Sequence, residues 1–186
     1  MRTCGGISIE IKARCSDPFR VRQILKSRQA DFKGLDRQRD TYFRVPSGRL
    51  KLREGRIENA LIYYKRTDQK NSKKCDSVLW KSPVPRGPGG SEGLSPLRSL
   101  KKILEAAAGV LAVVDKRREI YFIRNVKFHI DRVKNLGDFV EIEVFGRSGK
   151  KNETVLRKQC EFFQKLLGIE KKDLLADSYS DQLLRL

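Results

Sequence analysis

Histidine, cysteine and long apolar runs are scarce in this chain of 186 residues. His129 is the only histidine, and the four cysteines, Cys4, Cys15, Cys75 and Cys160, are widely spaced with no Cys-x-x-Cys pair. A zinc site needs clustered thiolates and imidazoles, and disulfide frameworks belong mostly to small secreted domains. The sequence therefore predicts neither a zinc centre nor a disulfide scaffold.

Membrane-spanning and secretory signals are also missing. No stretch approaches the roughly 18 consecutive apolar residues of a spanning helix, and the first residues lack the apolar core of a signal peptide. We therefore expect a protein of the reducing cytoplasm with no membrane partner.

Positive charge, by contrast, is abundant. Lysine and arginine number 41 against 23 aspartates and glutamates, a formal net charge of +18, while 39% of residues are hydrophobic. This balance predicts a globular protein with a polyanionic partner, such as nucleic acid, an anionic membrane or a phosphate-rich small molecule. Nucleic acid is the least favoured partner, because the basic residues alternate along predicted strands and do not cluster on a helix or beside exposed aromatics.

Strict alternation in the segment 7–12 is the main structural signal. Ile7, Ile9 and Ile11 fall on one face of a predicted strand, and Ser8, Glu10 and Lys12 fall on the other. The same pattern recurs along the chain. It predicts further strands at 38–43, 49–54, 60–66, 77–81, 113–122, 126–133 and 139–145.

Helices are predicted between these strands. One follows a cap at Ser16 or Asp17, begins with Pro18 and runs to about residue 30; others are expected at 97–108, 152–167 and, as a short one, within 174–186. The segment 83–93 is rich in proline and glycine and is expected to be a flexible loop within a single domain spanning 1–186.

Eight short strands joined by short turns favour an antiparallel meander, and closure into a barrel removes its exposed edges. The fold class predicted is α+β, a closed eight-stranded antiparallel β-barrel with flanking helices. The polar strand faces carry the basic residues Lys12, Lys51, Arg53, Lys65, Lys116 and Arg118, and the acidic residues Glu10, Asp40, Asp131, Glu141 and Glu143.

Two interpretations of these charged faces remain open at this point. Pointing outward, they form an ordinary solvated surface. Pointing inward, each isolated charge would cost several kcal/mol, so the charges must be paired or must meet a ligand. Arginine and lysine bind phosphate oxygens, and Glu10, Glu141 and Glu143 are hard oxygen donors suited to Mg²⁺ or Mn²⁺.

A series of motifs in one order resembles the CYTH superfamily, the triphosphate tunnel metalloenzymes. The series consists of Ile9-Glu10-Ile11-Lys12, Gln38-x-Asp40-x-Tyr42-Phe43, Leu50-Lys51-Leu52-Arg53, Lys65, Lys116-x-Arg118, His129-x-Asp131-x-Val133, Gly137-x-Phe139-x-Glu141-x-Glu143 and Ser178-Tyr179-Ser180-Asp181. The segment around His129 and the Ser-Tyr-Ser-Asp segment are most similar to the class IV adenylyl cyclase branch.

The resemblance implies a barrel that holds a triphosphate in its bore. By similarity, Glu10, Glu141 and Glu143 would bind metal, with Asp131 as a further candidate, and Lys12, Lys51, Arg53, Lys65, Lys116 and Arg118 would bind phosphates. In triphosphatase members, residues matching Tyr42 and Lys65 are proposed to activate water. In cyclase members, the ribose 3′-hydroxyl attacks the α-phosphorus and pyrophosphate leaves. His129 would serve as a phosphate or base contact.

The activity expected from this resemblance is that of an adenylyl cyclase that uses Mg²⁺ or Mn²⁺ to convert ATP to cyclic AMP and pyrophosphate. The alternatives are an inorganic or organic triphosphatase and a degenerate protein that only binds triphosphate or another polyanion. Ser8 motivates the last alternative, because the family has the first glutamate of Glu-x-Glu-x-Lys at that position. Expected partners are a nucleoside triphosphate or inorganic triphosphate, and a homodimer is the assembly considered.

Overall fold

Strand β1 (Gly6–Arg14), which the alternation predicts, pairs with a neighbour on each side. It runs antiparallel to β8 (Gly137–Arg147) over nine residue pairs, and to β5 (Lys73–Lys81) over three. The computed structural model describes residues 6–66, 73–82, 96–147 and 150–186. The predicted loop at 83–93 lies outside the described residues.

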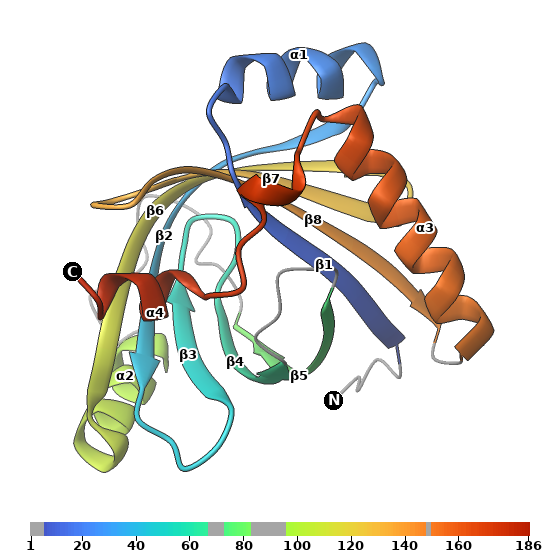
Figure 1. Cartoon of the computed structure of the whole chain (residues 1–186). Helices are drawn as coiled ribbons and strands as arrows, with labels where there is room; N and C mark the ends of the chain where they lie inside the picture. The colour runs from blue at the N-terminus through green and yellow to red at the C-terminus, as the bar shows by residue number, and fades with distance from the viewer. Residues whose placement is uncertain (1–5, 67–72, 83–95, 148–149) are drawn as a thin grey trace.

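The other strands complete a strongly curled antiparallel sheet (Figure 1). They are β2 (Asp31–Phe43), β3 (Arg49–Glu54), β4 (Ala60–Arg66), β6 (Val110–Ile123) and β7 (Val126–Val133), and the order of paired neighbours is β1-β5-β4-β3-β2-β6-β7-β8. The prediction of an α+β fold with eight antiparallel strands is confirmed. The sheet is a half-barrel, and among the described residues its two ends are joined by three residue pairs between β1 and β5, so full closure into a tunnel stays a prediction.

Two helices cover the outer face of β1, β7 and β8 (Figure 1). Helix α1 (Pro18–Ser27) begins after Asp17, whose carboxylate accepts the backbone N–H of Arg20 at 2.9 Å, so Asp17 is the cap of the two residues predicted, Ser16 and Asp17. Helix α3 (Lys150–Leu166) lies beside α1 along the same face.

The main hydrophobic core lies between these helices and the outer side of the sheet. Ile9 and Ile11 of β1, almost fully buried, pack with Leu25 of α1 and with Leu156 and Phe163 of α3. The apolar faces of the strands therefore point outward under helices. The alternation then directs the polar faces toward the interior.

A second helix layer covers β2, β3 and β4. Helix α2 (Pro96–Ala108) places Leu97 against Phe43 and Leu52. It ends at Gly109, whose φ of +70° is the left-handed conformation that commonly terminates helices. None of the helices in the described ranges is long and apolar enough to cross a membrane.

The C-terminal segment returns to the sheet after α3. It contains a short 3₁₀ turn (Lys171–Asp173) and helix α4 (Tyr179–Leu183), which Ser178 caps. The backbone N–H of Leu175 donates to the carbonyl of Lys12 at 2.9 Å. This contact fixes the segment against β1, and Tyr179 is buried there.

Candidate functional site

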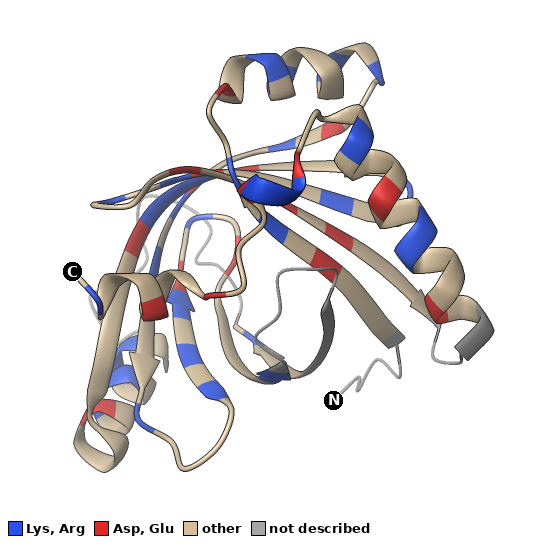
Figure 2. Ribbon diagram, in the orientation of Figure 1, with Lys and Arg blue, Asp and Glu red and all other residues tan. Residues whose placement is uncertain are grey.

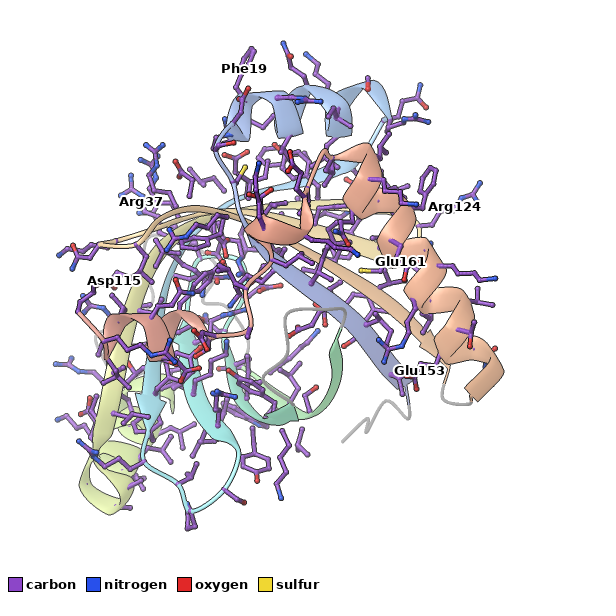
Figure 3. The ribbon with its side chains drawn as sticks, in the orientation of Figure 1. Phe19, Arg37, Asp115, Arg124, Glu153 and Glu161 are labelled. Carbon is purple, nitrogen blue, oxygen red and sulfur yellow. The ribbon has the colours of Figure 1, made fainter. Side chains whose placement is uncertain are left out.

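The polar strand faces line an interior cavity of about 400 Å³. Strand β2 demonstrates the arrangement: Asp36 and Asp40 are fully buried, whereas Arg37 between them is exposed. Figure 3 shows Arg37, and Asp115 of β6, on the outside of the sheet. Of the two interpretations of the charged faces, the structure supports the inward one.

Basic side chains dominate this cavity. Figure 2 shows lysine and arginine recurring along neighbouring strands. Among the described lining residues, seven are basic, namely Lys12, Lys51, Arg53, Lys81, Lys116, Arg118 and Lys127, and four are acidic, namely Glu10, Glu58, Glu141 and Glu143. The cavity therefore carries an excess of positive charge that suits a polyanionic ligand.

Asp40 organises the cations of β3 and β6. Its carboxylate accepts two hydrogen bonds from Arg53, at 2.8 and 2.9 Å, and one each from Lys116 at 2.6 Å and Lys51 at 3.2 Å. Burial alone would raise the pKa of Asp40, but Arg53, Lys116 and Lys51 together hold that pKa well below its usual range. Asp40 is therefore an ionised anchor that fixes three phosphate-binding candidates.

Arg118, two positions after Lys116 on β6, is anchored in a similar way. It donates to Asp131 through Nε at 2.7 Å and through Nη2, and Nη2 also donates to Glu141 at 2.7 Å. The hydroxyl of Tyr179 donates to the same Asp131 carboxylate at 2.9 Å. Asp131, a predicted metal ligand, is thus fully buried in an ion pair and is not among the lining residues of the cavity.

Lys116 sits among other cations. Burial lowers its pKa to about 7; Asp40 opposes this effect, and the nearby Arg53 and Arg118 reinforce it. Its ammonium group therefore loses its proton more easily than an ordinary lysine, and a bound anion would restore the charge.

His129 is buried with one nitrogen paired. Its Nδ1 lies 3.1 Å from Glu141 Oε2, whereas Nε2 has no hydrogen-bond partner among the described atoms. Burial, reinforced by Arg118, lowers the pKa of His129 to about 4, so the imidazole is neutral at pH 7. When Nδ1–H donates to Glu141, Nε2 is left as a hydrogen-bond acceptor inside a charged cavity.

Glu10 and Glu143 form the pair of carboxylates best suited to a metal ion. They are opposite each other in the β1–β8 register and both line the cavity. Burial, followed by the charge of Glu10, raises the pKa of Glu143 to about 7. A divalent cation would relieve this repulsion, and Mg²⁺ commonly takes only one or two carboxylates and keeps several waters.

The remaining predicted metal ligand, Glu141, has other partners. It lies 3.4 Å from Lys12 and accepts from Arg118. Within the described ranges, no group of three or more His, Cys, Asp or Glu is arranged to hold a metal ion. The donor set therefore fits a cation held by the Glu10 and Glu143 carboxylates together with water and ligand oxygens.

Ser8 occupies the position that the family fills with glutamate. Its hydroxyl hydrogen-bonds Glu143 and thereby lowers the pKa of that carboxyl, against the larger effect of burial. Ser8 thus supports one candidate ligand of the metal ion.

Lys65 is the one predicted phosphate-binding residue that the fold directs away from the cavity. Ile62 and Tyr64 of β4 line the cavity, and Lys65 is exposed at the next position of the alternation. By contrast, Tyr42 lines the cavity, with its hydroxyl 3.5 Å from Lys51 Nζ. The two residues expected to activate water together, Tyr42 and Lys65, therefore face opposite sides of the sheet, and Tyr42 contacts Lys51.

Lys127, Tyr179 and Glu58 are among the lining residues that were not predicted as site residues. Lys127 shares the inward face of β7 with His129, so the alternation could have identified it. Tyr179 belongs to the Ser-Tyr-Ser-Asp motif, but its burial against Lys12, whose Nζ lies 3.8 Å from the ring centroid, depends on the return of the C-terminal segment. Glu58 lies in a turn, where no periodicity indicates direction.

A curled antiparallel sheet with helices outside and paired charges inside defines a class of barrel-like proteins with a charged interior. Residues 6–179 match the CYTH domain model, so the chain belongs to the CYTH domain family. No curated protein matches the chain.

Solved structures share the fold at low sequence identity. A Pyrococcus horikoshii protein is 24% identical, with a TM-score of 0.71, covering 94% of this chain and 98% of its own. A candidate adenylate cyclase from Vibrio parahaemolyticus is 16% identical, with a TM-score of 0.74 and coverage of 97% and 99%. A Hippeastrum protein, described as a candidate adenylyl cyclase with dominant triphosphatase activity, is 14% identical, with a TM-score of 0.55 and coverage of 96% and 94%.

Proposed function

We propose that this protein is a divalent-metal-dependent enzyme that binds a triphosphate in a closed tunnel and acts as an adenylyl cyclase of the class IV type. The observation that carries the proposal is the set of seven basic residues that face one cavity beside the Glu10 and Glu143 carboxylates. Buried carboxylates such as Asp40 and Asp131 hold these cations in place, and a triphosphate would bring several negative charges to the same set in one molecule.

The cations have distinct roles in this proposal. Arg53 and Arg118 are fixed by Asp40 and Asp131, so their guanidinium groups are preorganised for phosphate oxygens. Lys12, Lys51 and Lys116 supply point charges along the same path. Mg²⁺ or Mn²⁺ at Glu10 and Glu143 would supply Lewis-acid polarisation of phosphate oxygens.

His129 favours the cyclase reaction over hydrolysis. Cyclisation needs a group that accepts the proton of the ribose 3′-hydroxyl, and the Nε2 of His129, unpaired among the described atoms, is the candidate. Besides burial, Arg118 and Lys127 help to lower the pKa of His129, so a bound triphosphate that offsets their charge would raise its basicity. Proton transfer to Nε2 would form an imidazolium that the neighbouring Glu141 stabilises through Nδ1. Lys116 and Arg118 would stabilise the pyrophosphate as it leaves.

Triphosphate hydrolysis is the second candidate, and Tyr42 supports it. The Tyr42 hydroxyl accepts from Lys51 Nζ at 3.5 Å, which holds it in the cavity where it would orient an attacking water. The same phosphate and metal contacts would then serve attack on the terminal phosphorus. The description of the Hippeastrum relative mentions both an adenylyl cyclase and a triphosphatase activity for one protein.

A product assay separates these functions. Purified protein is incubated with ATP or with tripolyphosphate, in Mg²⁺ or Mn²⁺, and cyclic AMP, pyrophosphate and orthophosphate are quantified. The proposal expects cyclic AMP and pyrophosphate from ATP, with loss of cyclic AMP in His129→Asn. Orthophosphate without cyclic AMP would establish the triphosphatase instead. Tight binding without any product would indicate a degenerate binder, in which Ser8→Glu should raise metal affinity.

A further inference from the structure

A row of three exposed arginines crosses the outer face of the sheet. Arg37 of β2 is paired in register with Arg117 of β6, and Arg117 is paired with Arg132 of β7. Residues directly opposite each other on antiparallel strands point to the same side of the sheet. All three side chains are exposed, so none of the described helices covers them, and Figure 3 shows Arg37 on the outer side. These three residues form the arginine row.

The alternation that fills the cavity also creates this row. Of three consecutive basic residues in β6, Lys116 and Arg118 are buried and line the cavity, whereas Arg117 between them is exposed outside. The basic residues do not cluster along the chain, but the pairing of β2, β6 and β7 brings one from each strand together. Like charges directly opposite each other destabilise a sheet. A bound anion would relieve this repulsion.

Two members of the arginine row have open guanidinium groups. Arg132 donates two hydrogen bonds to the Asp138 carboxylate, at 2.8 and 2.9 Å. Arg37 and Arg117, by contrast, have no ion-pair partner among the described residues. Their positions are directly opposite in the register, so one extended anion can reach both.

The surface around the arginine row is hollowed and basic. The row lies along an outer hollow of about 520 Å³, and a second hollow of about 620 Å³ adjoins it at Arg37 and Glu54. Glu54, Glu105 and Asp115 are the acidic residues among the described lining of these hollows. Five further basic side chains that are not buried join the arginine row there, namely Arg39, Arg98, Lys101, Lys102 and Lys134. Positive charge therefore continues from the sheet onto α2.

The chemistry of this surface favours one kind of polyanion. No aromatic side chain is among the described lining residues of the two hollows, and the large apolar one, Leu97, is buried against Phe43 and Leu52. Protein interfaces usually have an apolar or aromatic centre, and sites for single strands stack bases on aromatic rings. Neither feature is found here, whereas arginine binds phosphate oxygens through two hydrogen bonds at once.

We propose that this outer face binds the phosphodiester backbone of a nucleic-acid duplex without reading its sequence. Arg37 and Arg117 bind phosphates directly, and the neighbouring basic side chains extend the contact onto α2. The inference goes beyond the proposed function and is independent of it, because the cavity lies on the other side of the sheet.

Fluorescence anisotropy tests the proposal with blunt DNA and RNA duplexes of about 20 base pairs, titrated from about 50 to 200 mM salt. Their 5′-hydroxyl ends offer no terminal phosphate to the cavity. The logarithm of affinity should fall linearly with the logarithm of salt concentration, by about 0.9 for each phosphate neutralised. In the double variant Arg37→Gln/Arg117→Gln, affinity should fall about tenfold or more and the slope should become shallower by about 2.

A matched double variant controls for net charge. Arg124→Gln/Lys158→Gln also removes two exposed positive charges, and neither residue lines the two hollows. Figure 3 shows Arg124 beside α3, on the side of the molecule away from Arg37. This control should keep the slope of the unaltered protein. Both double variants should bind tripolyphosphate like the unaltered protein in calorimetric titration, which also reports that they are folded.

The outcomes separate the partners. Binding of DNA, of RNA or of both that is lost in the arginine-row variant alone supports the proposal and identifies the duplex. Equal loss in both double variants would overturn it in favour of diffuse attraction by net charge. A salt slope near zero in the unaltered protein would overturn it whatever the variants do. Binding of poly-glutamate without binding of either duplex would assign an acidic polypeptide instead. Failure to bind tripolyphosphate would refute the proposed function and leave this inference standing.

Discussion

Lys51 of β3 and Lys65 of β4 lie on adjacent strands and face opposite sides of the sheet. Lys51 lies in the cavity beside Asp40 and Tyr42, while Lys65 is exposed on the outer side. Substitution of Lys51 removes a proposed phosphate contact and a partner of the buried Asp40 carboxylate. Substitution of Lys65 removes a solvated charge.

We predict that Lys51→Ala lowers kcat/KM for the triphosphate substrate by about tenfold to a hundredfold, as loss of a charge-assisted contact implies. Lys65→Ala should stay within about twofold of the unaltered protein, because surface substitutions change little. Steady-state kinetics of the two variants provide the measurement. Equal loss in both would contradict the outward position of Lys65.

Glu143 carries the clearest dependence on pH. Its pKa is raised to about 7 from an ordinary value of 4.5, by burial and by Glu10. Between those values the folded state binds more protons at this site than the unfolded state, so this group makes stability fall as pH rises toward 7. Metal binding requires the ionised carboxylate, so Mg²⁺ or Mn²⁺ affinity should rise over the same range.

We predict that metal affinity, measured calorimetrically, increases as pH rises through about 7 and then levels off. Glu143→Gln should weaken binding at every pH and remove the increase, because no proton is then displaced. The same variant should lose less stability than the unaltered protein as pH rises toward 7. A pH-independent affinity in the unaltered protein would show that Glu143 is not a ligand.

At the scale of elements, the C-terminal segment connects the outside of the fold to the interior. Leu175 bonds the backbone of β1, and Tyr179 donates to Asp131, which in turn fixes Arg118. A segment at the end of the chain therefore orients a phosphate-binding candidate on β6.

We predict that Tyr179→Phe lowers the free energy of unfolding by about 1.5–3 kcal/mol, the range for a hydrogen bond to a charged group. Phenylalanine keeps the aromatic ring beneath Lys12, so the decrease in the free energy of unfolding measures the contribution of the Tyr179 hydroxyl alone. Denaturant unfolding measures the change. The substrate KM should rise more than kcat falls, since Arg118 loses orientation and not charge; an unchanged KM with reduced stability would limit Tyr179 to a structural role.

The elements themselves were largely predictable, because alternation and capping are local signals. The bounds of β3, β4 and β7 agree with the sequence pattern, and Asp17 caps α1 as expected. Strand β2 begins at Asp31, well before its predicted start, since its first half bulges at Gly34 and shows no clean alternation. The positions of Glu58 and Tyr179 could not be predicted, because a turn and a returning tail carry no periodic signal.

For the molecule as a whole, the interior charge couples ligand binding to stability. The cavity lining has more cations than anions among its described residues, and a bound polyanion relieves their repulsion only in the folded state. We predict that tripolyphosphate raises the melting temperature in proportion to the logarithm of its concentration, and more strongly at low than at high ionic strength. Differential scanning calorimetry with sulfate at matched ionic strength is the control; equal shifts with sulfate would indicate a nonspecific salt effect.

Because the hydrophobic core lies outside the sheet, the residues that pack under the helices are different from those that line the cavity. Apolar strand positions such as Ile9 and Ile11 contact the helices, and alternate positions such as Glu10 and Lys12 line the cavity. Substitutions at the alternate positions can change ligand preference while the helix-facing packing is kept. A lineage of such proteins can therefore diverge in chemistry while its architecture persists, which agrees with full-length structural likeness at 24% identity or less among the three relatives compared.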